Sequence, residues 1–155
     1  MTVRVQREPF DAGAEITQRT TDAAIGAVAS FIGVMRDRND GNAVASMTLE
    51  HYPGMTERAL EEIVEQARHR WQIVDALVVH RVGEFKPTDP IVLVIVTAAH
   101  RAPAFAACEF IMDFLKTDAP FWKKEATQAG TRWVDARASD DEARERWTDA
   151  GRDKR

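Results

Sequence analysis

Cysteine is almost absent from this chain of 155 residues, since Cys108 is the only one. A single cysteine excludes an internal disulfide and any zinc site built from several cysteines. Cys108 lies on the apolar face of a predicted helix, so we interpret it as a buried structural thiol rather than a nucleophile.

Long hydrophobic runs are missing as well. The longest fully apolar run, residues 91–96, is far too short to span a bilayer. The N-terminus lacks the apolar run of a signal peptide. We therefore expect a cytoplasmic protein with no membrane partner.

The chain also has no excess of positive charge. It carries 21 Lys and Arg against 25 Asp and Glu, a formal net charge of -4. A general nucleic-acid-binding domain is strongly basic, so we expect no nucleic-acid partner. The length and the ordinary share of hydrophobic residues fit one domain, which we place at residues 1–147, followed by a charged tail at 148–155 that we expect to be frayed.

Signatures of several enzyme classes are missing. The sequence has neither G-x-S-x-G nor a Ser-His-Asp signature, and neither of the common glycine-rich nucleotide-binding loops. His51, His80 and His100 follow or end predicted strands, but they lack short ligand spacing and no cysteine or carboxylate pair joins them. We predict no metal site and no cofactor. A metal-dependent hydrolase that uses these three histidines remains an alternative, and it would contain bound zinc or manganese.

Strand patterns outnumber helix patterns. Residues 24–35 are interpreted as a buried strand in which two glycines mark close approach of another backbone or a ligand. Residues 91–96 indicate a central strand covered on both faces. Residues 56–71 are typical of an amphipathic helix capped by Thr56, while residues 84–90 contain two prolines and predict a loop. Several strands are adjacent along the chain, which favours an α+β fold: a mostly antiparallel sheet with helices packed on it.

Residues 100–125 contain a predicted helix with positive side chains at both of its ends. Pro103 suits the first turn, where its missing N–H would have no intrahelical partner, and Pro120 prevents simple continuation. We predict that this segment brings cations from both helix ends into one anion-binding pocket. The competing interpretation is an ordinary helix, because cations often follow helices. The basic candidates are Arg36 at a predicted strand end, His100 and Arg101 before the helix, Lys116 near the end of the helix, and Lys123 and Lys124 after it.

This basic set suits an anionic ligand. Arginine makes planar, bidentate contacts to phosphate or carboxylate, whereas lysine offers a point charge. The predicted pocket therefore fits a phosphorylated small molecule, or equally the carboxylate end of another protein. A non-catalytic dimeric module that binds a phosphorylated metabolite remains an alternative function.

Six sequence blocks carry a family resemblance. The chain resembles the large, catalytic subunit of molybdopterin synthase, and the blocks follow the family order along nearly the whole chain. Any one block is weak evidence, but the ordered set is highly specific. The blocks are residues 31–36 (FIGVMR), 49–55 (LEHYPGM), 80–84 (HRVGE), 99–101 (AHR), 110–125 (FIMDFLKTDAPFWKKE) and 132–137 (RWVDAR).

The resemblance implies a reaction, a fold and partners. Family members convert cyclic pyranopterin monophosphate into molybdopterin, building its dithiolene during molybdenum cofactor biosynthesis. Sulfur arrives as a thiocarboxylate on the C-terminal Gly-Gly of a small ubiquitin-like subunit. The resemblance thus implies a sulfurtransferase with an α/β-hammerhead type of fold, in which two large subunits form the central homodimer of a heterotetramer.

The resemblance also implies the residues of the site. Sulfur transfer from an acyl carrier needs no nucleophile on this chain, which agrees with the missing signatures. We expect Lys116 and Lys123 to be catalytic, flanking the reacting carbons, with one of them as general acid/base. Val34 replaces a residue that is basic in some members, so we expect only a backbone contact there. We expect Arg137 to reach the neighbouring subunit's site. The implied substrate-binding residues are Val34, Met35, Arg36, His100, Arg101, Lys116, Lys123, Lys124, Glu125 and Arg137.

Overall fold

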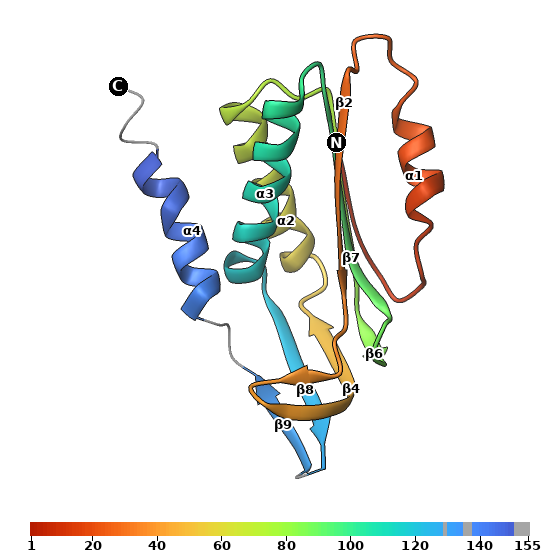
Figure 1. Ribbon diagram of the computed structural model, residues 1–155, viewed down its shortest axis with the longest axis vertical. Helices are drawn as coiled ribbons and strands as arrows, with labels where there is room; N and C mark the ends of the chain where they lie inside the picture. The colour runs from red at the N-terminus through yellow and green to blue at the C-terminus, as the bar shows by residue number, and fades with distance from the viewer. Residues whose placement is uncertain (129, 135–137, 151–155) are drawn as a thin grey trace.

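Two β-sheets and four helices make up the described part of the chain (Figure 1). The computed structural model describes residues 1–128, 130–134 and 138–150. The first sheet has the strand order β1-β5-β7-β2, and the second contains β3, β4, β8 and β9 with β6 paired to β4. Only β1 and β5 pair in parallel, so the predicted α+β class with mostly antiparallel pairing is confirmed. The elements are β1 (Thr2–Gln6), α1 (Ala12–Arg19), β2 (Ala27–Val34), β3 (Arg38–Asn39), β4 (Asn42–His51), α2 (Met55–Arg70), β5 (Asp75–Arg81), β6 (Gly83–Phe85), β7 (Pro90–Ala98), α3 (Arg101–Asp118), β8 (Phe121–Thr127), β9 (Gly130–Val134) and α4 (Ala138–Ala150).

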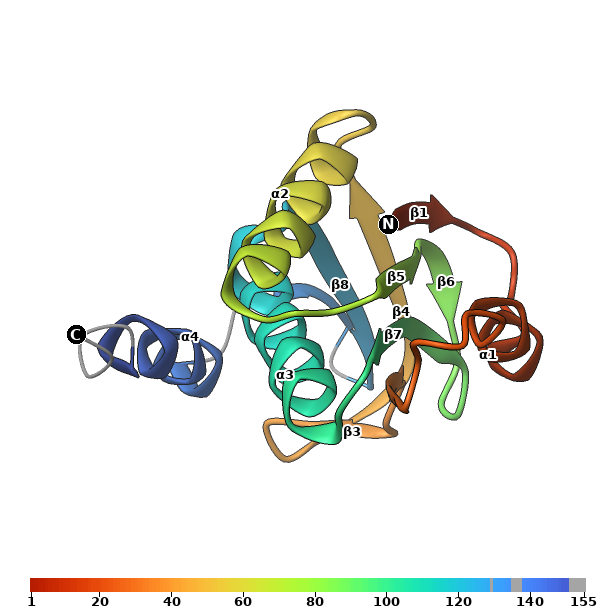
Figure 2. The same ribbon diagram turned by 90° about the horizontal axis from the view of Figure 1, so that it is seen from above.

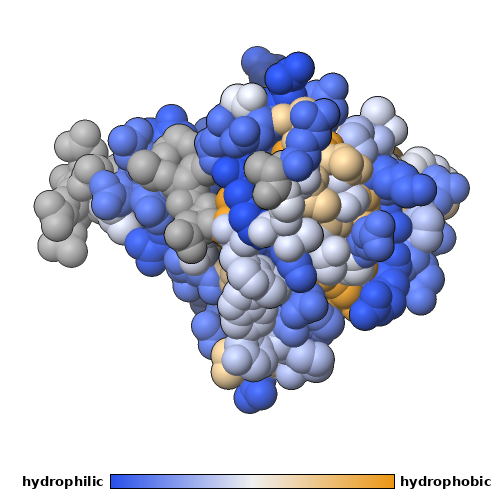
Figure 3. Space-filling view, turned by 90° about the horizontal axis from the view of Figure 1, so that it is seen from below, coloured by the Kyte–Doolittle hydropathy of each residue, from blue (hydrophilic) through white to orange (hydrophobic). Residues whose placement is uncertain are grey.

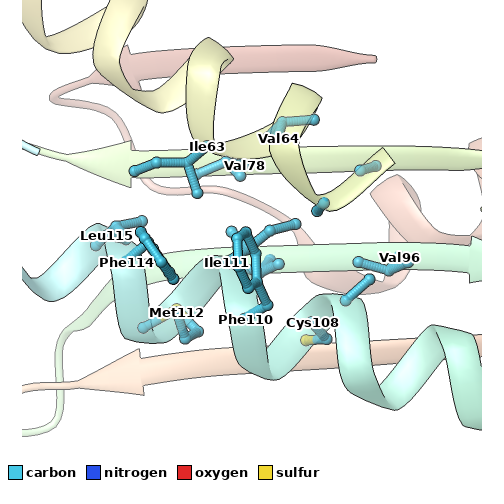
Figure 4. Packing of buried hydrophobic residues seen from close by; sticks show 14 of the residues in the cluster. Ile63, Val64, Val78, Val96, Cys108, Phe110, Ile111, Met112, Phe114 and Leu115 are labelled. Carbon is cyan, nitrogen blue, oxygen red and sulfur yellow. The ribbon is translucent and has the colours of Figure 1, made fainter. Parts of the chain in front are cut away.

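Helices cover both faces of the first sheet. Helices α2 and α3 lie on one face and α1 lies on the other, while the second sheet extends from one end of the first (Figures 1 and 2). The main core forms where α2 and α3 meet β5 and β7, as Figure 4 shows for Ile63, Val78 and Phe110. Side chains of β7 are buried on both faces, which confirms the predicted central strand.

Strand β2 is an exposed edge strand, so the prediction that it is buried is wrong. Its side chains Val28, Phe31, Ile32 and Val34 remain 38–48% exposed, while Ala29 faces the core. The reason is its place in the sheet: β2 pairs with β7 on one side, and no described strand pairs with its other side. A monomer thus leaves an apolar strand edge open.

Both glycines of this segment mark close approaches, as predicted. A Cβ on Gly26 would lie 2.2 Å from the carbonyl oxygen of Ala99, and a Cβ on Gly33 would lie 2.6 Å from Cγ1 of Val92. The backbone N–H of Gly26 donates to the carbonyl of Ala98 at 3.0 Å. The start of β2 is therefore held against the segment that leads into α3.

Two element boundaries differ from the prediction. Helix α2 begins at Met55 with Gly54 as its N-cap, and Thr56 lies inside the helix. The Thr56 hydroxyl accepts from the N–H of Tyr52 at 3.0 Å and donates to the carbonyl of Pro120 at 2.9 Å, so it ties the helix to the start of β8. The predicted loop at residues 84–90 begins with a short strand, β6, because its backbone completes the pairing of β4.

Helix α4 packs against the C-terminal half of α3. It runs to Ala150, beyond the predicted boundary at residue 147, and residues 151–155 lie outside the described part. The Trp147 indole donates to Oδ2 of Asp113 at 2.7 Å and packs edge-on against Phe110 at 5.5 Å. The helix thereby also brings Asp140 to the end of α3 that carries Lys116.

We expect Gly26→Ala to lower the free energy of unfolding by about 2 kcal/mol or more, because its Cβ would overlap a backbone oxygen that cannot rotate away. The matched control is Gly13→Ala in α1, where the nearest atom is 3.5 Å away and alanine favours the helix by about 0.5–1 kcal/mol. Urea unfolding of both variants is the measurement. Equal stabilities for the two would contradict the close approach.

Candidate active site

A cavity of about 340 Å³ lies where the two sheets meet the C-terminal end of α3. The end of β2, the β3–β4 hairpin, β7, β8 and α3 all contribute to its walls, and Asp140 of α4 lies at its rim. This end of the molecule is mostly hydrophilic, with apolar side chains visible between polar ones (Figure 3). The site thus combines apolar walls with a charged lining.

Six of the predicted site residues line this cavity. Strand β2 ends where the hairpin begins, so its last residue and the two that follow lie at one wall. Lys116 comes from the last turns of α3, on the opposite side. Strand β8 pairs with β4 so that Lys123 is opposite Leu49 and Glu125 is opposite Met47. The six residues are Val34, Met35, Arg36, Lys116, Lys123 and Glu125.

His100 and Arg101 do not join this cavity, so the prediction that one chain gathers cations from both helix ends is wrong. They lie at the N-terminal end of α3, whereas Lys116 lies at its C-terminal end. At about 1.5 Å per residue, the helix separates the two groups by roughly 20–25 Å. A rigid helix of this length cannot bring both of its ends to one ligand.

Lys124 also lies away from the cavity. Successive side chains of a strand point to opposite faces, so Lys123 faces the cavity and Lys124 faces outward. The Lys124 ammonium lies 5.7 Å from the ring centroid of Trp133, which is its cross-strand neighbour on β9. Arg137, the remaining predicted residue, lies outside the described residues.

Glu125 is a buried carboxylate that holds other site residues. It is only 2% exposed. Its Oε1 accepts from Nδ2 of Asn39 at 2.7 Å and lies 3.2 Å from Nζ of Lys123, and its Oε2 accepts from Arg132 at 3.3 Å. Burial by itself would raise the pKa of Glu125, but the hydrogen bonds and charges of these neighbours outweigh it and lower the pKa. The carboxylate is therefore ionised and orients Lys123, rather than being open to an anionic ligand.

The cavity includes residues that sequence reasoning did not assign to the site. Arg38 and Asn39 belong to the hairpin. The one sequence signal for this part of the site was that Arg38 lies two residues after Arg36 in a predicted turn. His80 entered the sequence analysis as a candidate metal ligand and as part of the block at residues 80–84, and neither gave it a role in the site. Nothing in the sequence pointed to Asp140 as a cavity residue, because its position at the cavity depends on how α4 packs.

His80 is a buried, neutral side chain of the cavity. It is 6% exposed and stacks on Phe121 with ring centroids 3.9 Å apart. Burial lowers its pKa to about 4, and the charges of Lys116 and His51 act in the same direction, while the hydrogen bond to Arg81 opposes them.

No metal group forms among the histidines that the sequence singled out. His51 pairs with Glu57 at 3.4 Å, His80 bonds its own neighbour's carbonyl, and His100 lies at the far end of α3. Within residues 1–128, 130–134 and 138–150, no group of three or more His, Cys, Asp or Glu side chains could hold a metal ion. None of the helices in these ranges is both long and apolar enough to cross a membrane.

The described lining indicates what the cavity can do chemically. It contains four permanent or near-permanent cations and apolar side chains, but no serine, threonine or cysteine. Such a lining can bind an anion, stabilise developing negative charge and deliver protons. The fold and site therefore define a candidate enzyme subunit whose cavity suits an anionic ligand.

The chain belongs to the MoaE family. The family model described as "MoaE protein" matches residues 5–118, which confirms the resemblance inferred from the sequence. The chain is 62% identical over 147 residues to the molybdopterin synthase catalytic subunit of Ralstonia nicotianae, covering 94% of this chain and 84% of that relative.

Solved structures agree with this assignment. The molybdopterin biosynthesis MoaE protein from Burkholderia ambifaria matches with a TM-score of 0.82 and 54% identity, over 95% of this chain and 97% of the other. A protein–protein complex of subunits 1 and 2 of the molybdopterin-converting factor from Helicobacter pylori matches with a TM-score of 0.70 over 87% and 91% of the two chains. At 17% identity, this second likeness shows a shared fold.

We expect Glu125→Gln to lower the free energy of unfolding by about 1–2 kcal/mol, because the partly exposed Lys123 and Arg132 lose their hydrogen bonds to a charged carboxylate. Glu84→Gln on the exposed side of β6 is the control and is expected to change stability by less than about 0.5 kcal/mol. Denaturant unfolding at neutral pH measures both. Similar stabilities of the two variants would show that the Glu125 network contributes little.

Proposed function

We propose that the sulfur transfer of molybdopterin synthase takes place in this cavity and that the protein acts in the cytoplasm. The sulfur donor is the C-terminal thiocarboxylate of a small ubiquitin-like subunit ending in Gly-Gly. The acceptor is cyclic pyranopterin monophosphate, and the product is the dithiolene of molybdopterin. The observation that carries the proposal is that Lys116 of α3 and Lys123 of β8 line one cavity with Arg36, and that its described lining contains no serine, threonine or cysteine.

The lysines and arginines of the cavity have different roles in the proposed reaction. The thiocarboxylate sulfur of the partner supplies the electron pair for the new C–S bond, a C–O bond of the substrate breaks, and the oxygen that leaves needs a proton. Water then hydrolyses the resulting thioester, so that the sulfur stays on the substrate and the partner leaves as a carboxylate. Lys116 and Lys123 reach the cavity from different elements, so one ammonium group can donate that proton while the other stabilises negative charge. Arg36 and Arg38 on the hairpin suit the substrate phosphate, which they can bind through paired N–H groups.

The Glu125 network gives Lys123 its part in this reaction. A lysine side chain has four rotatable bonds, and freezing them costs free energy. The ion pair with Glu125, at 3.2 Å, fixes the ammonium group before substrate arrives. Prior placement of this kind lowers the entropic part of the barrier.

We expect Lys116→Ala and Lys123→Ala to reduce product formation by about a hundredfold or more, which is the usual loss when a general acid/base is removed. Binding of the thiocarboxylated small subunit and the oligomeric state should remain unchanged. Lys124→Ala is the matched control, because it removes the neighbouring lysine on the outward face of β8. Dithiolene formation with purified partner and substrate is the assay. Normal turnover by either pocket variant would remove that lysine from the mechanism.

The open edge of β2 supports a homodimer. Its exposed apolar side chains, Val28, Phe31, Ile32 and Val34, are suited to burial against a second copy. Most homodimers have a twofold axis, and two copies of one edge strand related by such an axis perpendicular to the sheet pair antiparallel. The sheet would then continue from one protomer into the next.

Such pairing would complete the site with residues from the second copy. Strand β2 begins with Ala27 beside Ala98, near His100, and it ends at Val34 beside the cavity. Antiparallel pairing places the start of one β2 next to the end of the other. His100 and Arg101 of the second copy thereby come to the side of the cavity formed by the first, which accounts for their separation from Lys116 within one chain. The small subunit then remains at the outer end of each protomer.

A subunit-mixing experiment tests this shared site. We expect Lys116→Ala and Arg101→Ala homodimers to be inactive, whereas mixed dimers regain turnover because one of their two sites has both residues intact. Mixing Lys116→Ala with Lys123→Ala is the control, since both lysines line the same cavity of one chain and no intact site can form. The measurement is dithiolene formation after dissociation and reassociation of the mixed subunits. If the first mixture remains as inactive as the control, Arg101 does not act across the dimer.

A further inference from the structure

His80 occupies the cavity in a position that the proposed reaction does not explain. Along β5, Ala76, Val78 and His80 share one face of the strand, and the first two are buried in the core under α2 and α3. His80 is the last of this row, where the core ends and the cavity begins. Burying an imidazole costs free energy of desolvation, whereas an apolar side chain would fill this position without that cost. The histidine is therefore expected to have a polar role here.

The ring is held in one orientation and one tautomer. Its Nδ1 lies 2.8 Å from the carbonyl oxygen of Arg81, and a carbonyl can only accept, so Nδ1 carries the hydrogen. The ring also stacks on Phe121 at 3.9 Å with an interplanar angle of 23°. Because Nδ1 carries the hydrogen and donates it to Arg81, Nε2 of the neutral ring has a lone pair and can accept a hydrogen bond.

The surroundings keep this acceptor neutral. Burial and the charges of Lys116 and His51 hold the pKa of His80 at about 4, so at neutral pH the ring is uncharged. The nearby cations Arg36, Lys116 and Lys123 can only donate hydrogen bonds. A neutral imidazole among these cations therefore supplies a complementary function, which is to accept a hydrogen bond without attracting or repelling the substrate's charge.

We propose that His80 is a specificity-determining residue of the cavity, where its Nε2 accepts a hydrogen bond from an N–H or O–H group of the bound pterin. The inference rests on the proposed function and adds to it the group that recognises the uncharged part of the substrate. A site that accepts a hydrogen bond discriminates strongly against ligands that lack the donor, because a buried acceptor would be left unpaired.

Two variants of His80 separate acceptance of a hydrogen bond from packing. His80→Phe retains an aromatic ring on Phe121 but removes the acceptor, whereas His80→Gln retains an acceptor oxygen close to the position of Nε2. We expect His80→Phe to raise KM for cyclic pyranopterin monophosphate roughly tenfold, and His80→Gln to stay within about threefold of the wild type. His69→Gln is the control, since His69 is exposed on α2 and does not line the cavity. An unchanged KM in His80→Phe, or equal losses in both His80 variants, would overturn the inference.

Nitrogen NMR of the wild-type protein gives a second readout that does not depend on how the variants fold. Labelled His80 should show one protonated nitrogen and one with a free electron pair, and saturating substrate should shift the second signal as it accepts a hydrogen bond. A signal that does not move would overturn the inference and leave the sulfur transfer intact, provided that the wild type forms product. A wild type that forms no product with thiocarboxylated partner would overturn the proposed function together with this inference.

Discussion

The buried carboxylate of Glu125 is the interaction on which the candidate site depends. One of its oxygens bonds Asn39 of the hairpin and Lys123 of its own strand, and the other bonds Arg132 of β9. Three elements of the second sheet are thereby fixed to one charge that water cannot reach. Because a buried charge without partners would be very costly, these side chains hold their places only together. The buried charge of Glu125 thus fixes both this wall of the cavity and the position of Lys123.

The first sheet and its helices provide the rest of the cavity, and they do so from a different direction. The row of core side chains on β5 ends in His80, and the last turns of α3 present Lys116. The tie from Thr56 to Pro120 joins α2 to the start of β8, so the two halves are connected just beside the site. Charged donors and a neutral acceptor therefore meet at the boundary between two separately packed layers.

Much of the site was predictable because reactive residues stand at the ends of recognisable elements. Local signals of this kind mark Arg36 after an apolar strand, Lys116 in the last turn of a helix and Lys123 after Pro120. The strand character of residues 121–127 gave no such signal, and without it the outward direction of Lys124 could not be foreseen. The edge position of β2 was missed for a similar reason: an apolar strand has the same pattern whether core or a second chain covers it.

The α+β class, the central strand, the family and most of the basic residues of the site could be predicted from the sequence, because periodicity, turn residues and ordered motifs are local properties. Which cations meet depended on the three-dimensional packing. It separated His100 and Arg101 from Lys116 by the length of a rigid helix, turned Lys124 away from Lys123, and placed Asn39 and His80 at the cavity. The physical reason is that convergence depends on strand register and on packing between layers, which join residues far apart in the chain.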